Sequence, residues 1–132
     1  MRLKDTLSTS SNMDRNLEEL KLLFDYTKWQ SRFCLIIATV GAAAVASTEY
    51  NIDARHGPMW VAIILSIVAG FSAGVVVSGI PGFHGTIDEY WDKRLGPIWH
   101  FMPAKYWYYL QHGALYAAMV FVGIGMILGR QK

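Results

Sequence analysis

MWVAIILSIVAGFSAGVVVSGIPGF, residues 59–83, is a stretch without a single aspartate, glutamate, lysine, arginine or histidine. The hydrocarbon core of a bilayer is about 30 Å thick and an α-helix rises about 1.5 Å per residue, so about 20 apolar residues cross it. Because lipid offers no water to hydrogen-bond exposed peptide groups, a segment that crosses must be helical. The stretch therefore predicts a transmembrane helix.

Two further uncharged stretches flank this one. Residues 33–48 contain no charged or histidine side chain, and residues 106–129 are interrupted only by His112. The first stretch reaches the required length only if its amphipathic flanks, residues 29–32 and 49–50, lie among lipid headgroups. We therefore predict an all-α integral membrane protein with three transmembrane helices. The predicted spans cover residues 30–50, 59–80 and 106–128 of a single membrane domain, residues 13–132.

The composition agrees with this class. Charged residues make up 17% of the chain, against about 25% in soluble domains. A soluble bundle of buried helices is the alternative, but its helices would need polar faces, which these stretches lack. The net charge is only +2, and in the loop after the second span three acidic residues balance three basic ones. We therefore expect the lipid bilayer, and not nucleic acid, to be a partner.

The distribution of lysine and arginine predicts the orientation. Six of the 12 basic residues precede the first uncharged stretch and three lie between the second and third spans. Basic residues collect in cytoplasmic loops. The sequence therefore predicts a multi-pass protein of the cell membrane with its N-terminus in the cytoplasm and its C-terminus outside.

The N-terminal segment has two expected parts. Residues 1–12 are rich in serine and are expected to be mobile, and Ser11 with Asp14 resembles a capping box that starts a helix. Apolar residues then recur at helical spacing opposite charged ones. They are Met13, Leu17, Leu20 and Phe24. This amphipathic helix either lies on the membrane surface or docks a partner, and Lys28 with Trp29 favours the surface.

The second loop contains a further helix signal. Thr86 and Glu89 form a capping-box pattern, which predicts a short helix over residues 87–95 that stops at Gly96 and Pro97. Nine of the 18 aromatic residues fall in residues 83–109. Amphipathic rings settle at the boundary between membrane and water. We therefore expect this helix to lie in the interface.

Small residues recur every fourth position in the second span. They are Ser66, Gly70, Gly74 and Ser78. Such rows let helix backbones approach closely in lipid. We expect this row to pack on a matching row of the first span, which consists of Ala38, Ala42 and Ala46. Contact with a second copy of the chain is the alternative, and Gly125 and Gly129 of the third span offer another such pair.

The third span places Tyr109, His112 and Tyr116 on one helix face. A polar side chain within a span is costly, so it should face protein or water. His112 could contact haem or quinone or relay a proton, or it could simply bond to a backbone carbonyl or a tyrosine. Haem held by two histidines would need a second histidine within the spans. Haem or quinone is therefore expected only together with a partner subunit.

The sequence contains no recognisable catalytic pattern, so we do not expect an enzyme. Four loop residues could be assembled into a metal site but lack the spacing of known ligand sets, so no metal is expected. They are His84, Asp88, Asp92 and His100. The sequence favours an accessory or structural subunit of a membrane complex, partnered by other membrane subunits or by further copies. A pore-forming, holin-like protein and a haem- or quinone-contacting anchor of a redox complex are the alternatives.

Overall fold

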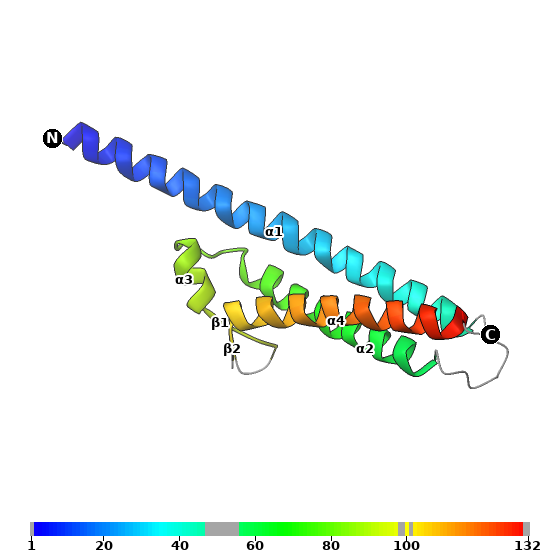
Figure 1. The fold of residues 1–132 in the computed structure, drawn as a ribbon. Coiled ribbons are helices and arrows are strands. Elements are labelled where there is room, and N and C mark those ends of the chain that lie inside the picture. The colour runs from blue at the N-terminus through cyan, green and yellow to red at the C-terminus, as the bar shows by residue number, and fades with distance from the viewer. Residues whose placement is uncertain (1, 47–55, 98–99, 101, 131–132) are drawn as a thin grey trace.

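The computed structural model describes residues 2–46, 56–97, 100 and 102–130 (Figure 1). Within this part of the chain, the elements are four α-helices and two short strands. They are α1 (Arg2–Ala46), α2 (His56–Gly79), α3 (Ile87–Asp92), β1 (Arg94–Leu95), β2 (Met102–Pro103) and α4 (Ala104–Arg130). The chain is thus mostly helical, and the predicted all-α class is confirmed.

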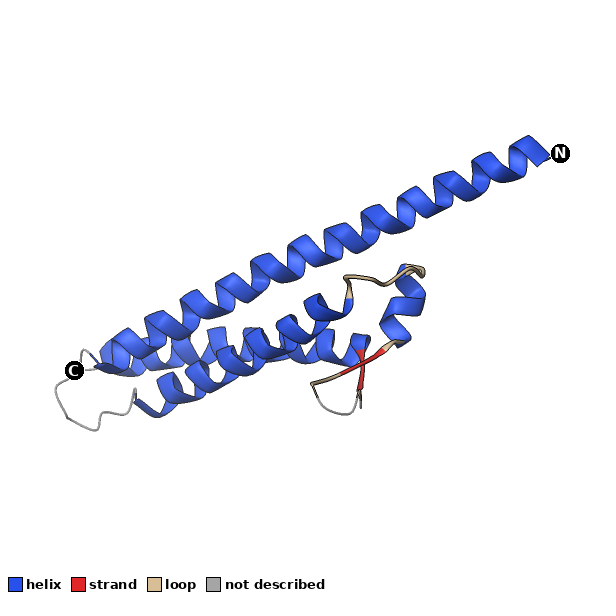
Figure 2. Cartoon of the chain, turned by 180° about the vertical axis from the view of Figure 1, so that it is seen from behind, coloured by secondary structure: helices blue, strands red, loops and turns tan. Residues whose placement is uncertain are grey.

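The three long helices form an elongated bundle in which α2 is the central element. Figures 1 and 2 show α2 running antiparallel to both α1 and α4. It packs along α1 on one side and along α4 on the other, whereas α1 and α4 touch each other over only a short length. The N-terminal part of α1 continues well beyond the bundle (Figure 1). The fold therefore depends on the two faces of α2.

The buried residues of α2, apart from Ser72, lie three and four positions apart in alternation. They are Met59, Ala62, Ser66, Ala69, Ala73 and Val76. A spacing that averages 3.5 residues keeps these side chains on one seam, as in coiled coils. Most of them are small, so neighbouring backbones can come close.

The same spacing continues on the two outer helices. On α1 the buried positions are Leu20, Leu23, Thr27, Gln30, Cys34 and Gly41. On α4 they are Ala104, Trp107, Gln111, Ala114, Ala118 and Gly125, together with Leu115 beside Ala114. The two glycines mark the closest approaches. A Cβ added at Gly41 would lie 3.0 Å from Ile63 Cγ1, and one at Gly125 would lie 2.9 Å from Met59 Cε.

Large apolar side chains lie on the outside of the bundle. Ile64, Ile67 and Phe71 of α2 are more than half exposed, whereas Ala69 and Ala73 of the same helix are completely buried. Soluble proteins normally bury the large apolar residues first. The interior of the bundle thus contains many small and polar residues beside larger ones such as Leu20, Trp107 and Leu115, and many large apolar residues lie outside.

Two of the helices are long and apolar enough to cross a membrane, α2 over Gly57–Gly79 and α4 over Ala104–Leu128. These helices contain the second and third predicted spans. The first predicted span, residues 30–50, is not confirmed. The apolar part of α1 between Phe33 and Ala46 is about 21 Å long at about 1.5 Å per residue, which is short of the hydrocarbon thickness. Residues 47–50, on which the prediction also relied, lie outside the described residues.

The start of α1 differs from the prediction. The helix already begins at Arg2 and runs without a break through Ser11. The Ser11 hydroxyl donates to the carbonyl of Ser8 at 3.1 Å, so it does not cap a helix. A serine inside a helix commonly satisfies its hydroxyl in this way, by bonding back to the preceding turn. The predicted capping box at Ser11 is therefore wrong, and the mobility of residues 1–12 stays a prediction.

The predicted helix after Thr86 is confirmed as α3. Glu89 N donates to Thr86 Oγ1 at 3.3 Å, and Thr86 N donates to Glu89 Oε2 at 3.0 Å, which completes the capping box. The helix ends at Asp92 instead of residue 95, because Arg94 and Leu95 pair with the segment before α4 as an antiparallel hairpin. The sequence-based prediction did not include this hairpin.

Tyr90 joins α3 to the end of α2. Its side chain is completely buried, and its hydroxyl donates to the carbonyl of Val76. Burial raises the pKa of the Tyr90 phenol, so the hydroxyl keeps its proton and remains a donor. On the other side, Trp107 Nε1 of α4 donates to the Leu95 carbonyl at 3.0 Å. These two bonds fix the second loop to the ends of α2 and α4.

Enlarging a small residue of the α2 seam should destabilise the bundle. Ala69→Leu places extra atoms where the side chain is 0% exposed, and overpacking of this kind costs about 1–3 kcal/mol. Thermal unfolding in mild detergent, followed by circular dichroism, should show a lower midpoint for this variant. Ala42→Leu, at an exposed alanine of α1, is the control and should unfold like the unmodified protein. Equal midpoints for both variants would contradict the close packing of α2.

Candidate functional site

Two glutamines join α1 and α4 in the interior of the bundle. Gln111 Nε2 donates to Gln30 Oε1 at 2.5 Å, although the two residues are 81 positions apart in sequence. Gln30 is 2% exposed and Gln111 is 0% exposed. Because α1 and α4 otherwise meet little, this bond is a main link between the two outer helices.

His112 forms a second link one position further along α4. Its Nδ1 lies 2.9 Å from the Tyr108 carbonyl oxygen, and its Nε2 lies 3.2 Å from the Tyr26 hydroxyl of α1. A carbonyl oxygen only accepts, so Nδ1 must carry a proton. In the neutral ring Nε2 then accepts the hydrogen of the Tyr26 hydroxyl. The sequence-based alternative of a histidine bonded to a backbone carbonyl and a tyrosine matches this geometry.

Aromatic rings surround His112. Tyr26 stacks on it with 6.0 Å between ring centroids and an angle of 14°, and Tyr108 lies at 4.2 Å. Tyr116, from the predicted face, lies at 6.4 Å. Tyr109, also from that face, is 66% exposed, and its ring packs against Tyr108. The structure therefore brings Tyr116 to the histidine and places Tyr108 and Tyr26 closer to it than the predicted Tyr109.

Three buried polar atoms in the described part of the chain have no hydrogen-bond partner there. They are Thr27 Oγ1, Ser66 Oγ and Gln111 Oε1. Each oxygen can accept a hydrogen bond, and a buried acceptor without a donor costs free energy. Thr27 precedes Gln30 on the α1 seam by one turn. The hydroxyls of Thr27 and Ser66 can also donate, so a buried water, which both donates and accepts, is the simplest group that would satisfy these atoms.

This contact can hold helices in register and pass hydrogen bonds along a short chain of side chains. Ligation of haem iron by His112 would require Nε2 to give up its bond to Tyr26, since Nδ1 is bonded to Tyr108 O. A quinone carbonyl needs a donor, and the Tyr26 hydroxyl is the nearest one to the histidine. The cofactor prediction, haem or quinone together with a partner subunit, stays untested.

The predicted row of small residues on α2 does not stay on one interface. Ser66 is buried, and a Cβ added at Gly70 would lie 3.7 Å from Cys34 Cβ of α1. Gly74 is exposed and a Cβ there would meet nothing within 4 Å, while Ser78 is exposed and bonds to its own helix. A four-residue step turns about 40° around a helix, so three steps turn about 120°. Half of the row therefore faces α1 and half faces outward.

The other small residues have different surroundings. Ala38 of α1 is half-buried, and Ala42 and Ala46 are exposed, so this row does not continue along the α1–α2 contact. Gly125 packs against Met59 of α2. Gly129 lies in the last turn of α4, where side-chain surroundings are outside the described part of the structure.

The polar residues of the second loop are spread apart. Asp92 pairs with Lys105 at 2.7 Å, and His100 lies in the turn between β1 and β2. Asp88 lies on α3, and His84 precedes it in the loop. Among the described residues, no three histidine, cysteine, aspartate or glutamate side chains converge as a metal site would require.

Comparison of this chain with models of known protein families, with curated proteins and with solved structures finds no match. Only the geometry of the chain itself therefore bears on its function.

Sequence reasoning missed the pair of glutamines and Thr27. A signal for them existed. Thr27, Gln30 and Cys34 follow one another at three- and four-residue spacing at the start of the first apolar stretch, and Gln111 lies within the third one. Polar residues at such positions commonly face another helix in membrane bundles. The partner of each glutamine could not be read from sequence, because it lies on a helix far along the chain.

A double-mutant cycle should detect the bond between the glutamines. Gln111→Leu leaves Gln30 buried and unpaired, and Gln30→Leu does the reverse, so each should lower stability. The double variant should lose less than the sum of the two, with a coupling of about 0.6–1.7 kcal/mol. Unfolding by denaturant in mild detergent measures all four stabilities.

The control combines Gln30→Leu with Ser78→Ala, since Ser78 is exposed and bonds only to its own helix. Those two effects should add. Strict additivity in the glutamine cycle as well would show that the glutamines do not interact.

Proposed function

We propose that this protein is a three-span membrane protein that acts as an accessory or structural subunit of a membrane complex. The observation that carries the proposal is the projection of α1, which continues past the bundle (Figure 2) and carries the exposed apolar residues Met13 and Leu17. The bundle would anchor the chain in lipid, and the projecting helix would bind a partner at the membrane surface.

The distribution of side chains supports a lipid environment for the bundle. Large apolar residues cover the outside of all three long helices, whereas the contacts between helices contain small and polar residues. In water such a surface would promote aggregation. In lipid the same surface is solvated, and close packing of small residues is what holds helices together. The first span would then combine the apolar end of α1 with residues that follow it.

The proposed orientation places the N-terminus and the second loop in the cytoplasm. Both lie at the same end of the bundle in Figure 1, so one side of the membrane would hold the projecting half of α1, α3 and the hairpin. Nine of the 12 basic residues lie in the N-terminal segment up to Arg32 or in the second loop. This is the arrangement that the excess of cytoplasmic lysine and arginine favours.

The straightness of α1 favours docking over lying on the membrane surface. The helix is continuous over 45 residues, which corresponds to about 68 Å. If its second half crosses the bilayer, its first half must leave the bilayer in nearly the same direction. A helix lying flat would need a sharp bend, which usually requires proline, a glycine–serine pair or an inserted group. Residues 2–40 contain no proline or glycine.

The exposed apolar residues Met13 and Leu17 of α1 lie N-terminal to the residues that pack in the bundle and begin about one helical turn away from them. Leu20 and Leu23 are buried against the bundle, whereas Met13 and Leu17 on the same side are 61% and 56% exposed. A groove of about 390 Å³ lies between this part of α1 and the loop that contains Phe83. An apolar helix of another subunit fits such a groove by adding its side chains to the exposed stripe.

The two alternatives have less support in the geometry. A pore requires a polar lining, and the buried polar groups described above lie between packed helices. A redox anchor would use His112, whose two ring nitrogens are engaged by Tyr26 and Tyr108. The absorption spectrum of the purified complex distinguishes a redox anchor from a structural subunit.

Alkaline carbonate washing tests the membrane assignment. We expect the protein to stay in the pellet after the wash and to be released only by detergent, because its apolar surface needs lipid or a substitute. A cytosolic soluble protein of the same host serves as the control for complete release. Recovery of this chain in the supernatant would overturn the proposed function.

Substitution of the uncovered stripe tests the docking role. Met13→Ser with Leu17→Ser should release the partner from the purified complex, because it removes apolar contacts without touching the bundle. Subunit composition measured by native mass spectrometry in mild detergent reports the loss. Leu22→Ser is the matched control, since Leu22 is 63% exposed and lies on the opposite side of the helix. Purification as a lone monomer from mild extracts would contradict the proposal, and so would equal loss of partner in both variants.

A further inference from the structure

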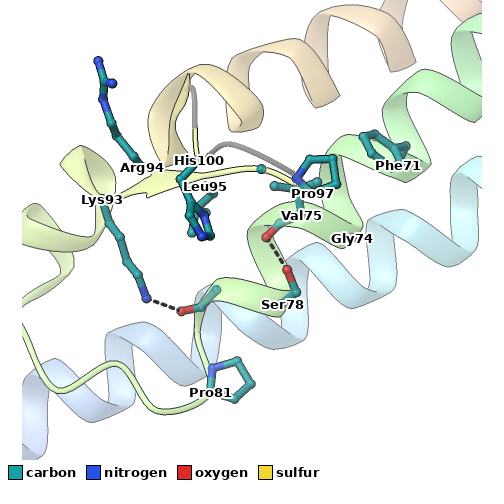
Figure 3. Close-up of a pocket in the computed structure, with 12 residues that line it drawn as sticks. Phe71, Gly74, Val75, Ser78, Pro81, Lys93, Arg94, Leu95, Pro97 and His100 are labelled. Carbon is teal, nitrogen blue, oxygen red and sulfur yellow. Dashed lines mark hydrogen bonds between the residues drawn. The ribbon is translucent and has the colours of Figure 1, made fainter.

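A cavity of about 460 Å³ opens where α2 ends beside the hairpin of the second loop (Figure 3). One wall is the last two turns of α2, and the other is formed by the hairpin. Lys93, Arg94 and His100 come from the hairpin side, and Phe71, Gly74 and Ser78 come from α2. The cavity therefore has a basic end and an apolar end.

The apolar end exists because the outer face of α2 changes from large to small residues. Ile64, Ile67 and Phe71 are followed on that face by Gly74 and Ser78. A Cβ built at Gly74 would meet nothing within 4 Å, so the hollow beside it is open. Phe71, which lines the end of this hollow away from Ser78, is 54% exposed. An extended hydrocarbon chain fits along this strip between Phe71 and Ser78.

The basic end carries positive charge without a facing acid. None of the described residues that line the cavity is acidic. The Lys93 ammonium donates to the Gly79 carbonyl at 3.2 Å and lies 5.1 Å from the Phe83 ring centre. Both groups are uncharged, so the charge of Lys93 is not neutralised, and two of its three N–H donors remain for a ligand.

Arg94 and His100 lie at the mouth of this cavity. Arg94 is exposed and has no ion pair among the described residues, and Figure 3 shows its side chain extending outward from the rim. The imidazole of His100 points back toward α2 in the same view. His100 has a φ of 43°, a backbone region that side chains other than glycine enter rarely and that is often found at ligand sites. Because Arg94 extends away from the cavity whereas the His100 imidazole and the Lys93 ammonium face it, a group held in the cavity would lie closest to His100 and Lys93.

The level of the cavity matches a lipid headgroup. Gly79, to which Lys93 bonds, is the last residue of the apolar stretch of α2. In the proposed orientation this end of the bundle faces the cytoplasm, where the leaflet is rich in anionic lipid. A phosphate at this level would lie beside Lys93 and His100, while its acyl chain would lie against the outer face of α2.

We propose that this cavity binds one anionic phospholipid. The headgroup phosphate is held by Lys93 and His100, Arg94 at the rim adds to the positive charge that attracts it, and one acyl chain lies in the strip beside Phe71 and Gly74. Lys93 also compensates the negative end of the α2 dipole, so its position is fixed before the lipid arrives. This inference rests on the proposed membrane location and orientation. It is independent of the docking role of α1.

The test is the lipid that stays bound to the full-length protein. The protein is purified in mild detergent, exposed to mixed micelles with equal amounts of phosphatidylglycerol and phosphatidylcholine of the same chain length, and measured by native mass spectrometry. We expect selective retention of one phosphatidylglycerol. The variant Arg94→Gln with His100→Gln should bind it at least about fivefold more weakly, because each basic group near the surface contributes about that factor.

The matched control is Arg15→Gln with His84→Gln, which removes the same residue types away from the cavity and should retain phosphatidylglycerol normally. Gly74→Leu tests the apolar end, since its side chain fills the strip without meeting another residue, and it should reduce retention while the unfolding midpoint stays unchanged. Equal retention of the two lipids, or loss in the control as large as in the cavity variant, would overturn the site.

Inorganic phosphate added in excess distinguishes a lipid site from a simple phosphate site. The lipid should remain bound, since its chain contributes to binding, and displacement by phosphate alone would overturn the proposal. A protein that is recovered from the membrane pellet but shows no preference for phosphatidylglycerol would refute this site only. A protein released by carbonate would refute the membrane function itself.

Discussion

Close approach of α2 to two helices at once is the constraint on which the rest of the structure depends. A single helix can pack closely against two neighbours only if the side chains on its contact faces are small. Alanine supplies such small side chains at Ala62, Ala69 and Ala73. The large side chains of α2 are consequently left on the outside, where they need an apolar solvent. One property of one helix thus links the packing of the bundle to its proposed place in the membrane.

The polar contact between α1 and α4 complements this packing. Small residues bring helices together but specify rotation and sliding only weakly, since alanine faces resemble one another. The bond between Gln30 and Gln111 and the bond between Tyr26 and His112 have narrow geometric requirements. Together they select one register for two helices that hardly touch elsewhere.

The sequence predicted those features that local signals determine. The length of the uncharged stretches identified α2 and α4, and the Thr86–Glu89 pair identified α3. Each of these signals lies within or directly beside the element that it predicts. Features that depend on distant partners were not predicted. The hairpin at residues 94–103 requires pairing across a turn, and the Gln30–Gln111 bond joins segments 81 residues apart. The start of α1 was misplaced because a serine can either cap a helix or bond back within one. The small-residue row on α2 was taken as one face, although a four-residue step drifts around the helix.

The unbroken course of α1 makes its projecting part move together with the bundle as one rod. The projecting part between Arg2 and Leu20 is about 27 Å long at about 1.5 Å per residue. A tilt of the helix by about 10° therefore moves the N-terminal tip sideways by about 5 Å, a displacement close to one helical turn. In the proposed membrane arrangement, changes in bilayer thickness alter helix tilt and would in this way move the N-terminal tip beyond the headgroups.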